Sequence, residues 1–399
     1  MTQDTIRVVV IGASFAGINA AQQLMKSVDS DKVRLTVIDK RGHFYYTPGS
    51  VRSPVSKDFA EKVWISLDQW LPHTLPHRLI QGCVSEVHPS HVLLQETEEI
   101  YSYDYLIVSS GVQFSVPFRF PTNDKAEGIK AAHAYADNVA KATKVLIVGG
   151  GPTGVELAGE IKDVYPDKEV TLVHGGDWLL SDQMPLNFRR KLTERVRDLG
   201  IKLILNDRLD LDPSQTDAAE QSVSLTTYHT RSGIQLEADW LVSAIGAVQV
   251  QTQFMDSLLL PHSPHVFHPE THALRVLPTM QLAHPDYPHI FVPGDANDFP
   301  CIKSAYRAGI QGEIAGENLA QLIKHRLATQ DNPKCTRATP TLREFTDPAN
   351  VAVVTLGSKA GLALLYFGFI FGNWLASKVK GQDLLLWKAE ATVRKPVGT

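Results

Sequence analysis

The chain has 399 residues, which is too long for one ordinary hydrophobic core and fits two or three domains. Apolar residues make up 43% of it and charged residues 21%, a balance that excludes a disordered or fibrous protein. The formal net charge is −4 and no run of Lys and Arg occurs, so we expect no nucleic-acid partner.

Residues 6–40 are predicted to form a strand, a glycine-rich turn, a helix and a second strand. Within GASFAG, Gly12 permits a tight turn and Gly17 lets the helix pack closely on the sheet, while Ser14 stands at the second glycine position. The helix N-terminus offers free N–H groups to a pyrophosphate. Asp39 ends the second strand, where a carboxylate accepts hydrogen bonds from an adenosine ribose. The pattern predicts a dinucleotide site, against the alternative of a purely structural turn.

A second unit of the same kind follows further along the chain. Residues 101–121 are predicted to form a buried strand and then a proline-punctuated crossover into a second domain. Residues 143–175 repeat the order of strand, turn, helix and strand. The fingerprint GGGPTG supplies Gly149, Gly151 and Gly154, so we predict a second dinucleotide site in the same chain.

The second unit differs from the first at the end of its second strand, where His174 replaces an acidic residue. A carboxylate there would favour NADH and repel a 2′-phosphate, whereas a histidine does neither strongly. We therefore hypothesise that the second site takes NADH or NADPH. The alternative, that His174 is only a strand-end residue touching solvent, stays open.

The rest of the chain continues the alternation of strands and helices. The predicted elements are a strand at 238–248, a strand with an acidic turn at 288–298, an amphipathic helix at 303–327, a Pro/Thr-rich linker at 331–350 and a C-terminal module at 351–399.

These elements predict an α/β fold with two Rossmann-like, doubly wound dinucleotide-binding domains, one inserted in the other. We expect residues 1–115 and 249–335 to bind FAD tightly and residues 116–248 to bind the exchangeable NADH or NADPH. Residues 336–399 would form an interface or acceptor module. A plain dehydrogenase needs one such site, so two sites indicate electron transfer through a flavin.

The three cysteines Cys83, Cys301 and Cys335 are far apart and form no CxxC or CxxxxC pair. Neither a dithiol relay nor a thiolate metal site is therefore predicted, and the electron acceptor is expected to meet the flavin directly. Cys301 is interpreted as a packing residue. The histidine-containing loops at 88–91 and 261–272 lack metal-ligand spacing, so we expect no metal site.

Short motifs at strand ends resemble those of the FAD- and NAD(P)-linked reductases of the glutathione-reductase structural class. Gly294 and Asp295 match the second FAD motif of that class, whose aspartate binds the flavin ribityl chain. Ser109-Ser110-Gly111 and Ala244-Ile245-Gly246 match the two strand ends that mark its domain crossovers. The resemblance covers essentially the whole chain and implies the glutathione-reductase-like fold with FAD and NAD(P)H.

Within that class the chain most resembles the apoptosis-inducing-factor-like type that includes the ferroptosis suppressor proteins. Residues 154–174, the KSAYRAG segment at 303–309 and the tail from Lys380 to Lys388 carry the resemblance, and HFYYTPGSVR at 43–52 is similar to type II NADH:quinone reductases. The resemblance implies electron transfer from NAD(P)H to a quinone or another small acceptor. Two alternatives are a reductase for a protein or biosynthetic acceptor, and a redox-controlled signalling factor of the apoptosis-inducing-factor type.

Four further side chains are candidates near the redox centre. The resemblance implies that Glu156 positions the nicotinamide and that Lys380 lies near the flavin. The alternative for Glu156 is that its carboxylate only interacts with the dipole at the N-terminus of its helix. Lys303 would place a cation beside the reduced flavin, or be a solvated lysine. Arg52 would contact the FAD phosphates, or be a surface arginine. The candidate cofactor-binding residues also include Ala16, Lys40 and Val84.

The C-terminal module contains an apolar, aromatic stretch at 361–381. Its run of about sixteen almost uncharged residues falls short of the roughly twenty that span a bilayer. Its aromatic side chains would line a quinone tunnel or make a peripheral membrane contact. The alternative is a helix that packs on the FAD domain or across a homodimer interface. The sequence allows a monomer or a homodimer. Thr2 replaces the glycine needed for myristoylation, and only MTQDT precedes the first strand. We expect a cytoplasmic protein, with a peripheral place on a membrane, the mitochondrial outer face or a lipid droplet left open.

Overall fold

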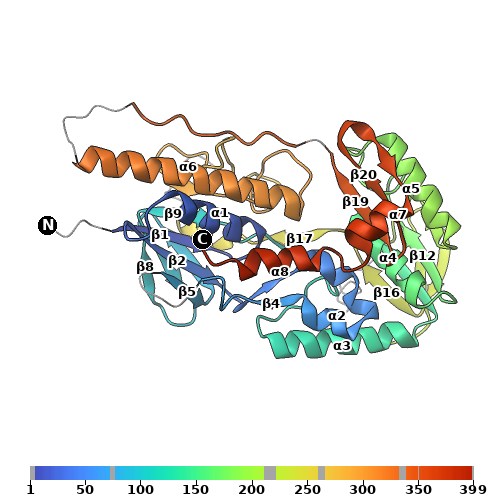
Figure 1. The fold of residues 1–399 in the computed structure, drawn as a ribbon. Helices are drawn as coiled ribbons and strands as arrows, with labels where there is room; N and C mark the ends of the chain where they lie inside the picture. Colours follow the sequence, from blue (N-terminus) through green and yellow to red (C-terminus); the bar gives the residue numbers. More distant parts are fainter. Residues whose placement is uncertain are drawn as a thin grey trace.

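The computed structural model describes residues 5–71, 77–210, 222–258, 266–331, 338–348 and 350–397. Two parallel sheets with helices packed on them make up most of the chain, and Figure 1 shows them side by side with the C-terminal segment (red) running from one to the other. The predicted α/β fold with two Rossmann-like units is confirmed.

The first sheet has the order β18-β9-β1-β2-β5, and all its strands are parallel. Its fifth strand in sequence returns from far down the chain, so the second unit is inserted between β9 and β18. The strands are β1 (Ile6–Ile11), β2 (Val33–Asp39), β5 (Arg78–Gln81), β9 (Tyr105–Val108) and β18 (Ile290–Phe291).

Two helices, α1 (Phe15–Ser27) and α6 (Ala305–Asp331), cover one face of this sheet and cross each other closely (Figure 1). A Cβ on Gly312 of α6 would lie 2.2 Å from the Ala16 carbonyl oxygen, and one on Gly316 would lie 2.3 Å from that of Ala20. The predicted helix at 303–327 is therefore confirmed. Gly312 and Gly316 are needed because the backbones of the two helices touch there.

The second sheet has the order β13-β12-β11-β16 and is also parallel. Two antiparallel strands, β10 (Val112–Phe114) and β17 (Ala247–Val250), carry the chain into and out of this unit. The sheet strands are β11 (Lys144–Val148), β12 (Glu169–Val173), β13 (Lys202–Ile204) and β16 (Trp240–Ser243), and the helices are α3 (Lys125–Lys141), α4 (Pro152–Val164) and α5 (Leu186–Asp198).

Smaller elements complete the two units. They are β3 (His43–Tyr45) with β4 (Trp64–Ser66), β6 (Val84–His88) with β7 (His91–Leu94) and β8 (Ile100–Ser102), β14 (Thr226–His229) with β15 (Gln235–Ala238), the short helix α2 (Lys57–Lys62), and the 3-10 turns η1 (Thr47–Val51), η2 (Ser53–Val55) and η5 (Gln253–Leu258).

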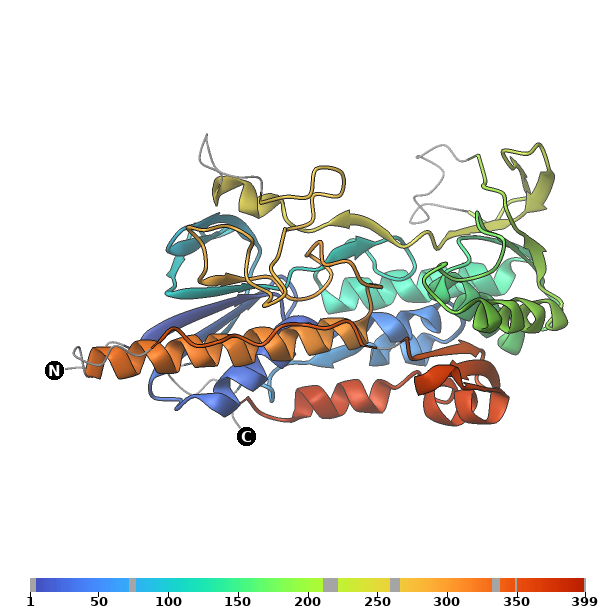
Figure 2. The same cartoon turned by 90° about the horizontal axis from the view of Figure 1, so that it is seen from above.

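The described part of the linker, residues 338–348, runs along α6 in both views (Figures 1 and 2). Asn318 on α6 donates to the Arg343 carbonyl at 2.8 Å and accepts from its backbone N–H at 2.8 Å. Phe345 is buried against Phe299, with ring centroids 5.0 Å apart. This half of the linker is therefore packed on the first unit.

The C-terminal module is a small antiparallel sheet followed by short helices. It contains β19 (Ala352–Leu356), β20 (Ala360–Leu364), η6 (Tyr366–Gly368), β21 (Ile370–Phe371), α7 (Asn373–Ala376), a π-helical turn η7 (Ser377–Gly381) and α8 (Leu386–Arg394). The alternative of one packed helix over 361–381 is wrong, because most of that stretch is hairpin. No helix within the described ranges combines the length and the apolar character needed to cross a bilayer.

Candidate functional site

The glycine-rich turn after β1 is closed on one side by Ser109, at the end of β9. Gly12 has φ +97°, and a Cβ on it would lie 2.4 Å from the Ser109 carbonyl oxygen. A Cβ on Gly17 would lie 1.9 Å from the Gly12 carbonyl oxygen. Ser14, which caps α1, makes no capping hydrogen bond through its side chain. The turn therefore admits only glycine at two positions and presents the start of α1 to a ligand.

Asp39, at the end of β2, is held in place by backbone donors. One carboxylate oxygen accepts from the Ala13 N–H at 2.7 Å and the other accepts from the Arg41 N–H at 2.8 Å. A carboxylate oxygen has two lone pairs, so each oxygen can still accept one more hydrogen bond. Asp39 is thus fixed at the strand end with acceptor capacity left for the predicted ribose contact.

Beside this turn lies a cluster of three cations, Lys40, Arg41 and Arg119, which lie near Asp39 but form no ion pair with it. Arg41 is buried and forms no ion pair in the described part of the chain, and its Nε and that of Arg119 have no hydrogen-bond partner. Burial lowers the pKa of Arg119 to about 10, with the positive charge of Arg41 adding to the effect. Burial, followed by the charges of Arg41 and Arg119, lowers the pKa of Lys40. Buried cations are costly without a counter-charge, so the cluster fits a pyrophosphate.

The predicted second FAD motif follows β18 and brings an acid and a base together. Gly294 has φ +95°, and its N–H donates to the Gln311 side chain at 2.8 Å. Burial raises the pKa of Asp295, and the neighbouring cations Lys303 and Arg119 oppose that rise. Lys303 donates to the backbone carbonyl and the side-chain oxygen of Asn297, each at 2.8 Å, and burial lowers its pKa. Asp295 accepts no hydrogen bond from any described residue, which leaves it available to a hydroxyl group.

The second glycine-rich turn repeats the geometry of the first. A Cβ on Gly149 (φ +115°) would lie 2.3 Å from the Ala244 carbonyl oxygen, and one on Gly154 would lie 2.0 Å from that of Gly149. Gly151 has nothing within 4 Å of its Cβ position. The space beside it is where a second pyrophosphate fits, as the fingerprint predicts.

The crossover glycines also face open space. Gly111 has φ +68° and Gly246 has φ +98°, and neither has an atom within 4 Å of its Cβ position. They follow strands β9 and β16, which end at the same edge of their sheets as the two glycine-rich turns. We call the turn after β1 the first cradle and the turn after β11 the second cradle. In open α/β sheets ligands bind at that carboxyl edge, so the two glycines border the candidate site.

His174 follows β12 and packs on the second turn. Its Nδ1 accepts a hydrogen bond from the Gly150 N–H at 3.2 Å, so the neutral imidazole carries its proton on Nε2. Burial lowers the pKa of His174 and the charges of Arg189 and Arg208 add to this effect, while hydrogen bonds with the backbone of Leu180 and Trp178 oppose it. The residue is neutral at pH 7 and bears no charge toward a ribose.

Glu156 and Lys380, predicted separately, meet between α4 and the C-terminal module. Lys380 donates to Glu156 Oε1 at 2.5 Å, and the Thr355 N–H donates to the same oxygen at 3.0 Å. Glu156 is 3% exposed. Within the described residues the other carboxylate oxygen, Oε2, accepts no hydrogen bond, so one acceptor remains for a ligand.

Arg52 is committed to a structural contact and not to a phosphate. Its guanidinium pairs with both carboxylate oxygens of Glu160 at 2.8 Å and donates to the carbonyls of Gly381 and Gln382 at 2.7 and 2.8 Å. These contacts use four of its five N–H groups, and the residue is buried, so Arg52 is not available to FAD phosphates. The arginines beside the first turn are Arg41 and Arg119, and the sequence predicted neither.

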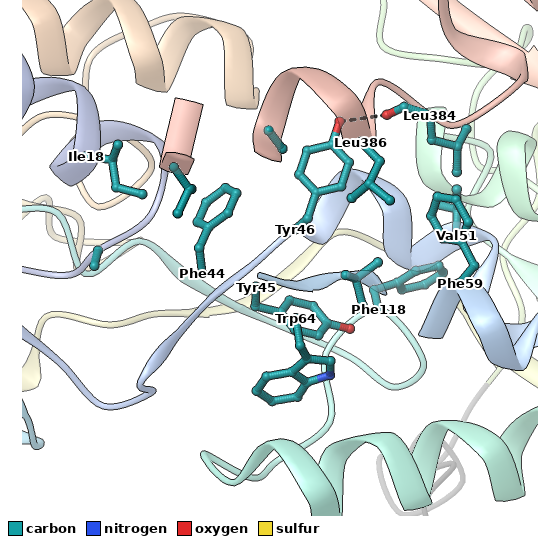
Figure 3. Close-up of a cluster of buried hydrophobic side chains, with 14 of the residues drawn as sticks. Ile18, Phe44, Tyr45, Tyr46, Val51, Phe59, Trp64, Phe118, Leu384 and Leu386 are labelled. Atoms are coloured by element: carbon teal, nitrogen blue, oxygen red, sulfur yellow. Dashed lines mark hydrogen bonds between the residues drawn. The ribbon is translucent and has the colours of Figure 1, made fainter. Parts of the chain in front are cut away.

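A hydrophobic contact joins the C-terminal module to the first unit (Figure 3). Tyr46 donates to the Leu384 carbonyl at 2.7 Å, and Leu384 and Leu386 lie in the same buried cluster as Tyr46 and Phe59. The Glu156–Lys380 ion pair holds the other end of the module on α4, so the module bridges both units.

The remaining candidates are packing residues through their side chains. Ala16 is 6% exposed beneath Gly294 and Gly312, and Val84 is 8% exposed in a core cluster. Cys301 is half-buried, and burial raises the pKa of its thiol, which lowers its reactivity. Within the described ranges no three His, Cys, Asp or Glu side chains gather as a metal-binding group. Cys335 and residues 261–265 lie outside the described residues.

Two glycine cradles in one chain, one beside buried cations and one beside a neutral histidine, define a class of oxidoreductase that joins a flavin to a pyridine nucleotide. The chain belongs to the pyridine nucleotide-disulphide oxidoreductase family, whose model matches residues 6–312. FAD and NAD(P)H are therefore the cofactors of the chain.

Curated relatives agree with the resemblance drawn from the motifs. The chain is 28% identical to apoptosis-inducing factor homolog A of Dictyostelium discoideum, over 98% of this chain and 92% of the relative. It is 25% identical to human ferroptosis suppressor protein 1, over 98% of this chain and 96% of the relative. The predicted similarity to this type of oxidoreductase is confirmed.

Solved structures share the fold over nearly the whole chain. NDH2 from Plasmodium falciparum in complex with NADH matches with a TM-score of 0.65 at 15% identity, over 98% of this chain and 96% of that one. The sulfide:quinone oxidoreductase of Aquifex aeolicus matches with a TM-score of 0.66 at 16% identity, over 97% of this chain and 92% of that one.

Proposed function

We propose that the chain is an NAD(P)H:quinone oxidoreductase. The observation that carries the proposal is the pair of cradles in a sequence that has no CxxC or CxxxxC pair. Without a dithiol relay, electrons leave the flavin directly for a separate acceptor. Two solved structures that share the fold are named as NDH2 and as a sulfide:quinone oxidoreductase, which favours a quinone as that acceptor.

In this proposal the FAD domain comprises residues 1–115 and 249–335, and the NAD(P) domain residues 116–248. Bound FAD supplies the redox chemistry, with a hydride received from NAD(P)H and two electrons passed on to the quinone. The Arg41 and Arg119 guanidinium groups neutralise the FAD pyrophosphate, and Asp39 accepts from the adenosine ribose. Asp295 accepts from a ribityl hydroxyl, by resemblance.

Lysine and glutamate side chains take the positions nearest the reacting rings. Lys303 is held by Asn297 and places a positive charge where a reduced flavin gains negative charge. Glu156 keeps one oxygen on Lys380, and its free oxygen would accept from the nicotinamide amide and so orient the ring for hydride transfer. The contact with Lys380 fixes the Glu156 side chain for this role.

Access for the acceptor is provided by an exposed aromatic surface on residues 366–374 of the C-terminal module. Phe367 is 97% exposed at the tip of a turn closed by a 2.9 Å hydrogen bond from Leu365 N–H to the Phe369 carbonyl. Trp374 is 73% exposed, and the Lys378 ammonium lies 5.4 Å from its ring centroid. Aromatic rings with adjacent lysines suit the interfacial region of a bilayer, where quinones dissolve. We therefore propose a peripheral membrane contact of a cytoplasmic protein through this surface.

One stopped-flow experiment tests both parts. The protein is first reduced with NADH without oxygen and then mixed either with a short-chain ubiquinone in solution or with a long-chain ubiquinone in anionic vesicles. The proposal predicts prompt flavin reoxidation by both. Trp374→Ser should slow reoxidation only by the vesicle-borne quinone, and Trp178→Ser, an aromatic of the second unit, should slow neither.

Two results would contradict the proposal. A reduced flavin that neither quinone reoxidises points to a protein or biosynthetic acceptor. Equal slowing of both quinones by Trp374→Ser rejects the membrane contact while leaving quinone reduction in place.

A further inference from the structure

An arginine that the sequence analysis did not consider lies at the end of β12, beside the second cradle. A Cβ on Gly175, the residue after His174, would lie 3.1 Å from Arg208 Nε and 3.5 Å from its Cζ. The Arg208 guanidinium therefore lies against the strand end. In a Rossmann unit this is where the adenosine ribose of the bound nucleotide is recognised.

The backbone on both sides of Arg208 is fixed against the strand end. The Asp207 N–H donates to the His174 carbonyl at 3.2 Å, and the Asn206 N–H donates to the Gly176 carbonyl at 3.1 Å. The Arg208 carbonyl accepts from the Arg231 N–H at 2.8 Å. The segment after β13 thus continues the pairing of the sheet and holds Arg208 in register with Gly175.

The neighbouring acid does not neutralise Arg208. The Asp207 carboxylate accepts from the Ser232 hydroxyl at 2.5 Å and from the Arg208 backbone N–H at 2.8 Å. Within the described residues the Arg208 guanidinium itself forms no hydrogen bond or ion pair, and the residue is exposed. A positive charge with free donors, on a segment whose backbone is fixed, therefore faces solvent at the strand end.

We propose that Arg208 binds the 2′-phosphate of NADPH and makes the second cradle selective for the phosphorylated nucleotide. A guanidinium matches a phosphate monoester with two parallel N–H donors. His174 contributes by being neutral, because a carboxylate in its place would repel the phosphate. The inference rests on the proposed function and names the form of the nucleotide that the oxidoreductase prefers.

The test uses two probes that differ only in the 2′-phosphate, adenosine 2′,5′-bisphosphate and adenosine 5′-monophosphate. Their dissociation constants are measured by calorimetry on the intact, FAD-loaded protein. The wild-type chain should bind the bisphosphate roughly tenfold or more tightly than the monophosphate. Arg208→Gln should abolish that difference while leaving the monophosphate affinity unchanged, and Arg208→Lys should retain part of it.

Arg231→Gln is the matched control, since Arg231 is an exposed arginine whose backbone bonds to Arg208. It should keep the full preference. The proposal is overturned if the wild-type chain binds the two probes alike, or if Arg208→Gln weakens both equally. Because no electron transfer is involved, this result is independent of whether quinone is the acceptor.

Discussion

The two cradles share one backbone design and differ in their charges. Gly12 lies against the Ser109 carbonyl as Gly149 lies against that of Ala244. Around the first cradle, arginines lie largely buried and form no ion pair, whereas at the second the strand end carries a neutral histidine and an exposed arginine. Buried charge suits a cofactor that stays bound, and an exposed charge suits a substrate that exchanges.

The comparison extends to the C-terminal module, which meets the two units by different means. It is joined to α4 of the second unit by the buried Glu156–Lys380 ion pair. To the first unit it is joined by apolar packing around Tyr46 and by Arg52, whose guanidinium donates to the carbonyls of Gly381 and Gln382. The module therefore contacts both units.

The largest expected effect comes from adding one methyl group to either cradle. Gly17→Ala places a Cβ 1.9 Å from the Gly12 carbonyl oxygen and should yield protein without flavin. Gly154→Ala places one 2.0 Å from the Gly149 carbonyl oxygen and should keep the flavin but lose its reduction by NADPH. Flavin absorbance and stopped-flow reduction measure the two outcomes.

Gly151→Ala is the control for this pair, because nothing lies within 4 Å of its Cβ position. It should fold with a full complement of flavin. If Gly17→Ala retained flavin and Gly154→Ala lost it, the assignment of the two cradles would be reversed.

A smaller effect distinguishes Arg52 from a cofactor ligand. Arg52→Met leaves Glu160, whose side chain is 3% exposed, without its cation, and should cost about 3–5 kcal/mol of unfolding free energy. Flavin content of the folded protein should not change. The double variant Arg52→Met, Glu160→Leu should regain most of the loss in chemical denaturation. If Arg52→Met lost flavin without any loss of unfolding free energy, Arg52 would contact the FAD phosphates after all.

The smallest effect concerns pH at the second cradle. Burial lowers the pKa of His174 below its ordinary 6.5, so the imidazole is neutral above that pH. Below that lowered pKa the protonated ring should add a positive charge near the 2′-phosphate and oppose the loss of binding that follows when the phosphate itself, with a second pKa of about 6, takes up a proton. The preference of kcat/KM for NADPH over NADH should therefore be the same in His174→Asn as in the wild type between about pH 7 and 8, and should fall more steeply on acidification in His174→Asn. Equal falls in the two proteins would contradict this.

The same shift has a consequence for stability. Because the folded-state pKa of His174 is lower than the unfolded-state value, the unfolded chain binds more protons as pH falls below 6.5. The contribution of His174 to stability is therefore present above pH 6.5 and declines on acidification.

Local patterns predicted the parts of the molecule that depend on neighbours in sequence. The glycine spacing and the apolar strands at 6–11 and 144–148 predicted both cradles. The helical periodicity of apolar residues over 303–327 predicted α6. The roles of Arg52 and Arg208 could not be predicted, because each depends on a partner segment distant in the chain. The stretch 361–381 was ambiguous, since a continuous apolar run suits a strand as well as a helix. Gly361, with φ +149°, is one place where the backbone leaves the helical region.

The central proposal is that one chain holds a flavin in the first cradle and receives hydride from a nucleotide in the second. Anaerobic titration of the purified protein with NADPH, followed by flavin absorbance, tests that claim directly. The account predicts stoichiometric FAD that NADPH bleaches completely. A colourless protein that takes up no FAD, or a bound flavin that neither NADPH nor NADH reduces, would contradict it.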